Sequence, residues 1–268
     1  MSRAAGRLYL LKLLVAAILL FILSPMIVVI ISSFGAASFL YFPPNSYSIK
    51  WYYEIFELDG LREALANSLL ISGIATPLSI VLGTTSALAI ARYKFAGKSA
   101  LMAMLLSPLV VPAIVIGISM LQFFRSIDGL STLQAMIAAH VAITLPYMVR
   151  TVVASLEMED ESMLEAAKML GANAFQSFAF VTLPTIKSSI FTGAIFVFII
   201  SFDNYAISMF LSDAATTTLP IKMLEFIESR TDPAMAALAS LLIVFSVILL
   251  CISTWAVGLK RVARMSGG

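Results

Sequence analysis

Charge is scarce in this sequence, and that scarcity excludes a soluble protein. Only 12% of the 268 residues are Asp, Glu, Lys or Arg, whereas 60% are hydrophobic. Soluble domains carry about 25% charged residues, and a mean hydropathy of +1.00 leaves too much apolar surface for a soluble core to bury. The formal net charge of +2 is too small to indicate nucleic-acid binding. The composition therefore predicts a polytopic membrane protein.

Reactive residues and nucleotide-binding motifs are scarce as well. The single cysteine, Cys251, excludes an internal disulfide and a cysteine-based zinc site. No cluster of His, Cys, Asp and Glu has metal-ligand spacing, and no nucleophile elbow occurs. The sequence has no G-x-x-x-x-G-K-[ST] motif, so the chain cannot hold ATP phosphates as a P-loop does. We therefore expect a protein that is not an enzyme and binds no cofactor or metal itself.

Long hydrophobic runs, in contrast, are abundant. Backbone polar groups in lipid must be satisfied within the segment, so each run is predicted to be one helix and the fold class to be all-α. The first run follows a basic N-terminus and is too long for the core of a signal peptide, so we expect an uncleaved span. Six runs can cross a hydrocarbon core about 30 Å thick, near residues 13–34, 66–91, 99–124, 134–155, 190–211 and 234–258.

The lysines and arginines favour one side of the membrane, and such residues gather in cytoplasmic loops. We therefore predict that both termini are cytoplasmic. The favoured side then holds twelve of them: Arg3, Arg7, Lys12, Arg92, Lys94, Lys98, Arg150, Lys168, Lys187, Lys260, Arg261 and Arg264. The other side holds five: Lys50, Arg62, Arg125, Lys222 and Arg230.

The connection between the fourth and fifth runs, residues 157–189, has local signals for two helices. Ser162 and the glutamate three residues later have the spacing of a capping box. Gly171 suits a left-handed C-cap, and Asn173 can cap a second helix. Pro184 predicts a break before the chain re-enters the membrane. The sequence therefore predicts a helix, a sharp turn and a helix.

This connection is longer than two adjacent spans require. Met163, Leu164 and Met169 place large apolar groups on its first helix, which makes that helix a candidate docking surface for another protein. A plain connector is the alternative. Acidic residues precede the helix and either meet basic groups of a partner or solvate the helix start: Glu157, Glu159, Asp160 and Glu161.

The stretch EAAKMLGANAFQSFAFVTLP at 165–184 resembles the EAA signature of permease subunits in ATP-binding-cassette importers. That signature has Glu-Ala-Ala, three residues, Gly, nine residues, an aliphatic residue, one residue and Leu-Pro. Val181 stands where Ile is usual. Residues 64–255 resemble the five-span core of type I importers, with the first span added. The matching positions are Glu165, Ala166, Ala167, Gly171, Val181, Leu183 and Pro184.

The segments SFDNYAISMFLS, TTTLP and DPAMAALASLLIV are similar to the second permease of spermidine/putrescine importers. This similarity favours a polyamine or related cation as the solute. Relatives of the same appearance handle opines, phosphonates, thiamine or iron chelates, so those solutes are alternatives. A secondary transporter is a further alternative, although such proteins often carry more buried ionisable residues.

The resemblance implies a permease subunit of the bacterial inner membrane with several partners. These are a second permease, which makes a heterodimer, two ATPase subunits that hold ATP and magnesium, and an extracytoplasmic solute-binding protein. It divides the chain into residues 1–63, a permease core 64–258 with the coupling loop 157–189, and a tail 259–268. The expected ATPase-coupling residues are Met163, Leu164, Glu165, Ala166, Ala167, Leu170, Gly171 and Pro184.

Polar residues inside the runs point to the solute path. A carboxylate within a span costs several kcal/mol unless it is hydrated or paired, so Asp203 is a functional-site candidate. With Asn204 and Tyr205 it lines a gate or path that favours a cation; the alternative is pairing with a partner base or neighbouring hydroxyls. His140 is interpreted as a hydrogen-bonded packing residue, with a proton relay as the alternative.

Acidic residues outnumber basic ones on the predicted outer side. Such an excess attracts cations, serves as a docking surface for a solute-binding protein, or reflects solvated loops. The acids are Glu54, Glu57, Asp59, Glu63, Asp128, Asp213, Glu225, Glu228 and Asp232.

Overall fold

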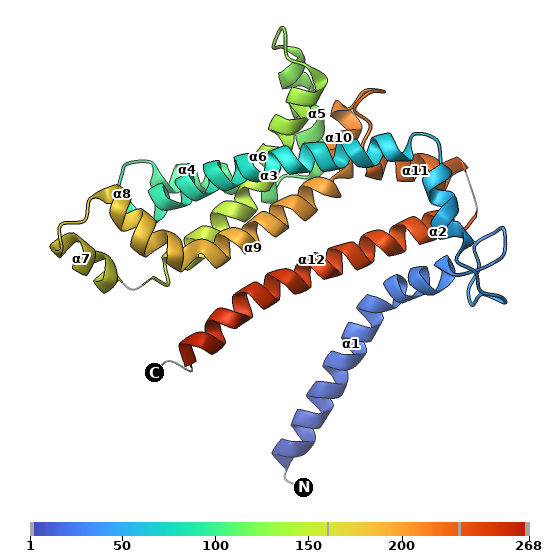
Figure 1. Cartoon of the computed structure of the whole chain (residues 1–268), viewed down its shortest axis with the longest axis horizontal. Helices are drawn as coiled ribbons and strands as arrows, with labels where there is room; N and C mark the ends of the chain where they lie inside the picture. Colours follow the sequence, from blue (N-terminus) through green and yellow to red (C-terminus); the bar gives the residue numbers. More distant parts are fainter. Residues whose placement is uncertain (1–2, 160, 230–231, 266–268) are drawn as a thin grey trace. The chain divides into compact units, whose positions relative to one another are not determined.

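The computed structural model describes residues 3–159, 161–229 and 232–265 (Figure 1). Regular structure in these residues is helical, apart from one isolated bridge between Gly35 and Tyr47. The all-α prediction is therefore confirmed. The helices are α1 (Arg3–Ser33), α2 (Lys50–Glu54), η1 (Ile55–Glu57), α3 (Leu61–Arg92), α4 (Lys98–Leu106), η2 (Ser107–Leu109), α5 (Ala113–Arg125), α6 (Thr132–Leu156), α7 (Glu161–Met169), α8 (Ala174–Ser177), the π-helix η3 (Phe178–Thr182), α9 (Leu183–Phe202), α10 (Tyr205–Leu211), α11 (Leu219–Ser229) and α12 (Ala234–Met265).

Five of these segments are long and apolar enough to cross a membrane as single helices. A sixth candidate is the pair Lys98–Leu109 and Ala113–Arg125, which is bent by 107° at a short break. Every predicted run overlaps one of these segments, although the fifth run, 190–211, extends past Phe202 into α10. The five single helices are Tyr9–Ser33, Leu61–Arg92, Thr132–Leu156, Ala174–Phe202 and Ala234–Trp255.

The prediction of one unbroken helix is wrong for two runs, 99–124 and 190–211. In the first, the chain breaks after η2 and restarts with Pro112 as the N-cap of α5, because a proline has no N–H and disfavours a helical residue before it. In the second, α9 ends at Phe202 and the Asn204 side chain caps α10, accepting from the N–H of Ile207 at 2.9 Å. An asparagine side chain competes with helix bonds in this way.

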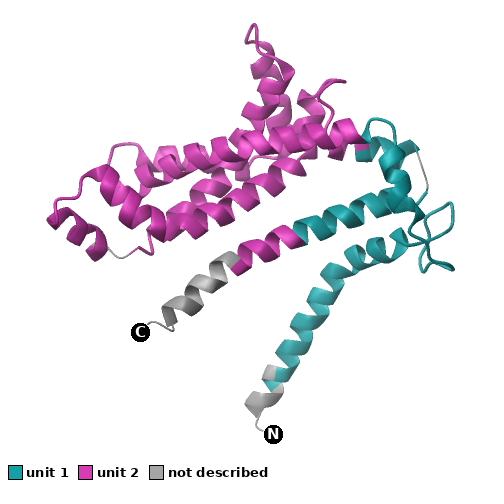
Figure 2. Ribbon diagram, viewed as in Figure 1, with its two compact units in different colours: residues 1–61, 223–247 teal, residues 62–222, 248–268 magenta. Residues whose placement is uncertain are grey.

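The chain forms two compact units (Figure 2). Unit 1 comprises Met1–Leu61 and Met223–Val247, and unit 2 comprises Arg62–Lys222 and Ile248–Gly268. The division into residues 1–63, 64–258 and 259–268 stays a prediction.

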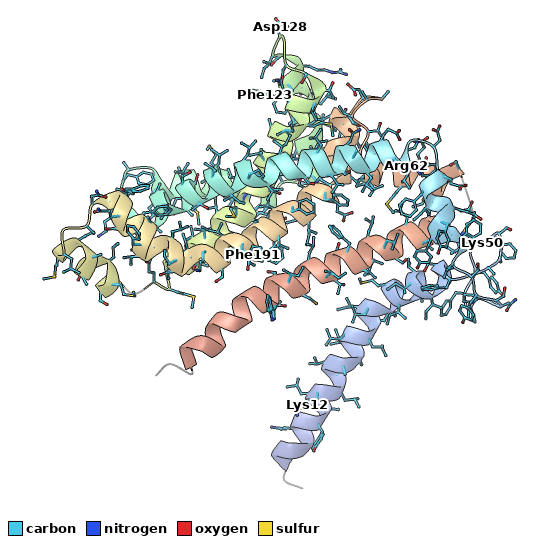
Figure 3. All side chains as sticks on the ribbon, in the orientation of Figure 1. Lys12, Lys50, Arg62, Phe123, Asp128 and Phe191 are labelled. Atoms are coloured by element: carbon cyan, nitrogen blue, oxygen red, sulfur yellow. The ribbon has the colours of Figure 1, made fainter. Side chains whose placement is uncertain are left out.

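In unit 1, α2 is tied by its aromatic side chains to other parts of the unit. The indole of Trp51 is buried and donates to the carbonyl of Gly35 at 2.8 Å. The hydroxyl of Tyr52 lies 2.7 Å from the Ser33 hydroxyl in α1 and 2.8 Å from the Ser240 hydroxyl in α12. No side chain in the most apolar part of α1 is buried within the chain. Figure 3 shows the side chains of α1, with Lys12 labelled, projecting outward from the helix. Lipid or another subunit must cover this surface.

Unit 2 is organised around α6, which packs along α9 and contacts α10, while α5 packs against α10. Many of the buried apolar side chains among its described residues gather in two clusters. The elbow-side cluster combines α3, α6 and α9 through Ala87, Ile90, Met148, Val149, Val152, Val153, Leu156, Ile186 and Val197. The α10-side cluster combines α3, α6 and α10 through Ile71, Met136, Ala139, Ile143, Ile207 and Leu211.

Two glycines allow close helix packing around Met148 of α6. A Cβ added at Gly83 of α3 would lie 2.6 Å from Cγ of Met148, and one added at Gly193 of α9 would lie 2.6 Å from its Sδ. Small residues at helix contacts allow this close approach in membranes. The three central helices therefore depend on glycine at these two positions.

We predict that Gly83→Ala lowers the stability of the protein, because the added methyl group overlaps the buried Met148. Overpacking of this kind costs about 1–3 kcal/mol. The matched control is Gly73→Ala on the same helix, where an added Cβ meets no atom within 4 Å. Thermal unfolding of the purified protein in detergent measures the difference, and equal midpoints for the two variants would contradict the packing described here.

Candidate functional site

The connection between α6 and α9, here called the elbow (residues 157–189), contains a sharply capped helix. Gly171 has a φ of +84°, a left-handed conformation that favours glycine. Its N–H donates to the carbonyl of Lys168 at 2.9 Å, and the N–H of Ala172 donates to the carbonyl of Ala167 at 3.0 Å. These two bonds form a Schellman motif, so the predicted C-cap at Gly171 is confirmed.

The second helix of the elbow begins at the predicted N-cap. The Asn173 side chain accepts from the N–H of Gln176, and the Gln176 side chain accepts from the N–H of Asn173, each at 2.9 Å. This reciprocal pair is a capping box. The start of the first helix differs from the prediction, because α7 begins at Glu161 and places Ser162 inside the first turn rather than at the N-cap. Asp160 lies outside the described residues.

Pro184 does not break the chain, which corrects the sequence-based expectation. The helix runs without interruption from Ala174 to Phe202. The turn before the proline is a π-helix, Phe178–Thr182, and the N–H of Leu183 donates to the carbonyl of Phe178. A π-turn lets a membrane helix absorb the missing proline donor by local adjustment. The elbow is therefore joined rigidly to α9.

The end of α7 presents apolar side chains to the surroundings. Met169 and Leu170 are each 89% exposed, and Met163 is 57% exposed. Glu165, Ala166, Gly171 and Pro184 are also exposed, whereas Leu164 and Ala167 are half-buried. The expected coupling residues thus lie on one short capped helix and its turn, except Pro184, which lies near the start of α9.

An ion pair that the sequence did not predict joins the elbow to α3. The guanidinium of Arg92, the last residue of α3, donates to Oε2 of Glu159, which follows the end of α6. The Glu159 side chain is 2% exposed, and its other oxygen has no partner in the described part of the chain. A buried carboxylate depends on its partner charge. This pair therefore fixes the first turn of the elbow against α3.

The residues expected in the solute path lie at the break between α9 and α10. Asp203 follows the last residue of α9 and is exposed, Asn204 caps α10, and Tyr205 is the first residue of α10. A Cβ at Gly117 of α5 would lie 2.6 Å from the ring of Phe210 in α10. α5 and α10 therefore approach closely just beyond this break.

His140 of α6 contacts both sides of the same break. Its Nδ1 lies 2.8 Å from the hydroxyl of Ser201 in α9, and its Nε2 lies 3.2 Å from the hydroxyl of Ser208 in α10. The imidazole is 1% exposed. The prediction of a buried, hydrogen-bonded histidine is confirmed.

The loop after α10, which contains the TTTLP segment, is tied to the start of α3. The amide of Asn67 donates to the carbonyls of Ala215 and Thr217, at 2.9 and 3.0 Å. The Ser68 hydroxyl accepts from the N–H of Leu219 at 2.8 Å. The exposed Asp213 side chain accepts hydrogen bonds within this loop. The pKa of Asp213 is lowered, mainly by a hydrogen bond from the Thr132 side chain and next by one from the Thr216 side chain. The loop after α10 is thus held against the start of α3.

No group of three or more His, Cys, Asp and Glu side chains in the described ranges could hold a metal ion.

The signal for the Arg92–Glu159 pair was present in the sequence as basic and acidic residues on the same predicted side. Many pairings were possible there, so the sequence could not select this one.

We predict that Glu159→Gln destabilises the protein by about 3 kcal/mol, because it leaves the Arg92 guanidinium without its buried partner charge. Glu157→Gln is the matched control, since that carboxylate is exposed two residues away. Thermal unfolding in detergent measures both variants. A Glu159→Gln midpoint equal to that of the control would show that the pair does not anchor the elbow.

Comparison with known proteins agrees with this architecture. Residues 76–259 match the family model described as binding-protein-dependent transport system inner membrane component. The spermidine/putrescine transport system permease protein PotC of Haemophilus influenzae is 32% identical over 209 residues, which cover 78% of this chain and 81% of that protein. The putrescine transport system permease protein PotI of Escherichia coli K12 is 30% identical over 230 residues, covering 83% and 82%.

A solved structure has the same fold at low sequence identity. It is the bacterial alginate ABC transporter in complex with an alginate pentasaccharide-bound periplasmic protein; the TM-score is 0.66 at 16% identity, over 99% of this chain and 98% of that one. The family match spans more than half of the sequence. The chain therefore belongs to the binding-protein-dependent transport system inner membrane components, the permease subunits of ABC importers, and is a transport subunit rather than an enzyme.

Proposed function

We propose that this permease forms half of the translocation path of an importer for polyamines such as spermidine and putrescine. A second permease forms the other half, two ATPase subunits supply energy, and an extracytoplasmic binding protein delivers the solute. The single observation that carries the proposal is the exposed apolar end of α7, held on a capped helix that is joined to a membrane span.

The elbow is suited to receive force from an ATPase. Met169 and Leu170 expose a large apolar surface that is costly in water and favours a protein partner. The Schellman motif at Gly171 and the capping box at Asn173 hold the surface rigidly relative to α9. A displacement of α7 by the partner would therefore move the membrane helix. ATP and magnesium bind to the partner, because this sequence has no P-loop.

The same proposal places the elbow and both chain termini in the cytoplasm of a bacterial cell. The basic residues gather on that side. The acidic excess on the opposite side creates a field that attracts cations. The α9–α10 break lies in the apolar fifth run and exposes the carboxylate of Asp203, which suits a path for a cationic solute.

The names of two relatives favour polyamines as the solute. Opines, phosphonates, thiamine and iron chelates are the alternatives that the same permease framework could carry. The binding protein selects among them, so the uptake assays below use radiolabelled spermidine and putrescine as probes.

We predict that Leu170→Asp abolishes association with the ATPase, because a carboxylate would be buried in an apolar contact. The amount of ATPase that co-purifies is expected to fall by at least about tenfold, as for the loss of a central contact residue. ATP-dependent uptake into proteoliposomes is expected to be lost as well. Tyr47→Asp is the control, since Tyr47 is 69% exposed in the loop on the predicted outer side.

Two results would contradict the importer. One is a Leu170→Asp variant that keeps its ATPase and its uptake. The other is wild-type uptake that persists without ATP and collapses when the proton gradient alone is dissipated, which is the behaviour of a secondary transporter.

We predict that Asp203→Asn leaves assembly intact but lowers polyamine uptake about tenfold, because the path loses the charge that favours a cation. Asp128→Asn removes the same charge from the exposed turn after α5, marked in Figure 3, and is expected to keep uptake near the wild-type rate. Initial uptake rates per assembled complex give the comparison. Wild-type uptake by Asp203→Asn would remove this residue from the solute path.

A further inference from the structure

A chain of buried polar side chains in unit 2 begins between the two apolar clusters, at Ser79 and Thr144, and continues into the α10-side cluster. The Ser79 hydroxyl of α3 lies 3.0 Å from that of Thr144 in α6, which donates to the carbonyl of His140 at 2.7 Å. The His140 imidazole continues the chain to Ser201 and Ser208. All five residues are at most 2% exposed. Each side chain has a hydrogen-bond partner, so this is a satisfied polar layer.

The polar side chains connect α9 with α10, two helices that belong to different apolar clusters. α3 and α6 contribute to both apolar clusters. α9 contributes Ile186 and Val197 to the elbow-side cluster alone, and α10 contributes Ile207 and Leu211 to the α10-side cluster alone. Packed interiors move as units rather than deforming continuously. The described part of unit 2 therefore contains two packed groups that share α3 and α6.

His140 is the side chain that joins these groups across the α9–α10 break. Ser201 belongs to the last turn of α9, and Ser208 to α10, with Asp203 and Asn204 between them. An imidazole has two ring nitrogens, and a serine hydroxyl either donates or accepts, so both bonds form with either tautomer. An apolar side chain of similar volume could fill the space but could not fix the two helix ends to each other.

A movement that starts at the elbow would reach this connection along α9. The helix Ala174–Phe202 runs from the elbow to the break without interruption. Beyond Phe202, a movement of this helix reaches α10 through the backbone of the break or through the His140 bonds. The His140 bonds are buried and come from α6, whereas the break itself is partly exposed.

We propose that His140 is a positioning residue for transport: it holds the ends of α9 and α10 in register and passes movement of α9 to α10. In this arrangement it sets the position of Asp203, Asn204 and Tyr205 without touching the solute. The proposal rests on the proposed function of the break as part of the solute path.

The first test compares uptake with ATP hydrolysis in proteoliposomes that contain the complete importer and its binding protein. Radiolabelled spermidine and putrescine are the probes. His140→Ala is expected to lower uptake per ATP hydrolysed about tenfold, the effect of losing one buried hydrogen-bonding group. His140→Gln keeps a polar group that can reach Ser208 and is expected to restore part of the ratio. Ser72→Ala is the matched control, because within the described part of the chain that buried hydroxyl donates to carbonyls of its own helix.

The ratio of uptake to ATP hydrolysis distinguishes a positioning role of His140 from a merely structural one. A structural role would lower the amount of complex, its ATP hydrolysis and its uptake together, and the ratio would stay unchanged; that result would overturn the proposal. Where His140→Ala prevents assembly, the double variant Ser201→Ala, Ser208→Ala removes the same two bonds and keeps the imidazole. An unchanged ratio in that variant would overturn the proposal equally.

A second measurement does not depend on the solute. Spin labels are placed on exposed positions of α9 and α10 by Phe196→Cys and Met209→Cys, after the exposed Cys251 is replaced by serine. Pulsed EPR is expected to give a narrow distance distribution with His140 and a broad one with His140→Ala. An unchanged distribution would overturn the proposal. Failure of wild-type polyamine uptake would contradict the proposed function instead, so the two failures are distinguishable.

Discussion

Backbone hydrogen bonding in lipid is the constraint on which the rest of this structure depends. An unpaired N–H or C=O in the hydrocarbon region costs several kcal/mol, so spans are helices that break only where a side chain or a turn supplies the missing partner. The two interrupted runs follow this rule. Pro112 starts α5 without needing a bond for its nitrogen, and the Asn204 side chain satisfies the start of α10. The π-turn before Pro184 solves the same problem without a break.

These local solutions decide which parts of the protein can act as rigid bodies. Because the helix from Ala174 to Phe202 is continuous, the elbow and α9 form one lever. The lever is anchored at one end by the Arg92–Glu159 pair and meets the His140 bonds at the other. An importer needs such a lever, since its energy is released on a separate subunit and its solute path lies inside the membrane. The exposed apolar end of α7 is the part of the lever that a partner can reach.

The sequence predicted the number and order of the apolar runs, because hydropathy alone determines which segments enter lipid. It also predicted the caps at Gly171 and Asn173, because these depend on residues only three or four positions apart. It did not predict the uninterrupted helix at Pro184, since the π-turn depends on the geometry of neighbouring turns. The Arg92–Glu159 pair and the two serines around His140 come from helices distant in the chain, and no local pattern selects such partners.

The central claim is that the elbow receives force from a separate ATP-hydrolysing subunit, and cross-linking in living cells tests it most directly. A photo-reactive amino acid at Leu170 would be irradiated in cells that carry the complete importer. The account predicts a cross-link between Leu170 and a cytoplasmic ATPase subunit. In a control chain that lacks α7 and carries the probe at an adjacent loop position, this cross-link is expected to be absent. A cross-link to an extracytoplasmic protein, or labelling of a cysteine at position 170 by a membrane-impermeant reagent added outside intact cells, would contradict it.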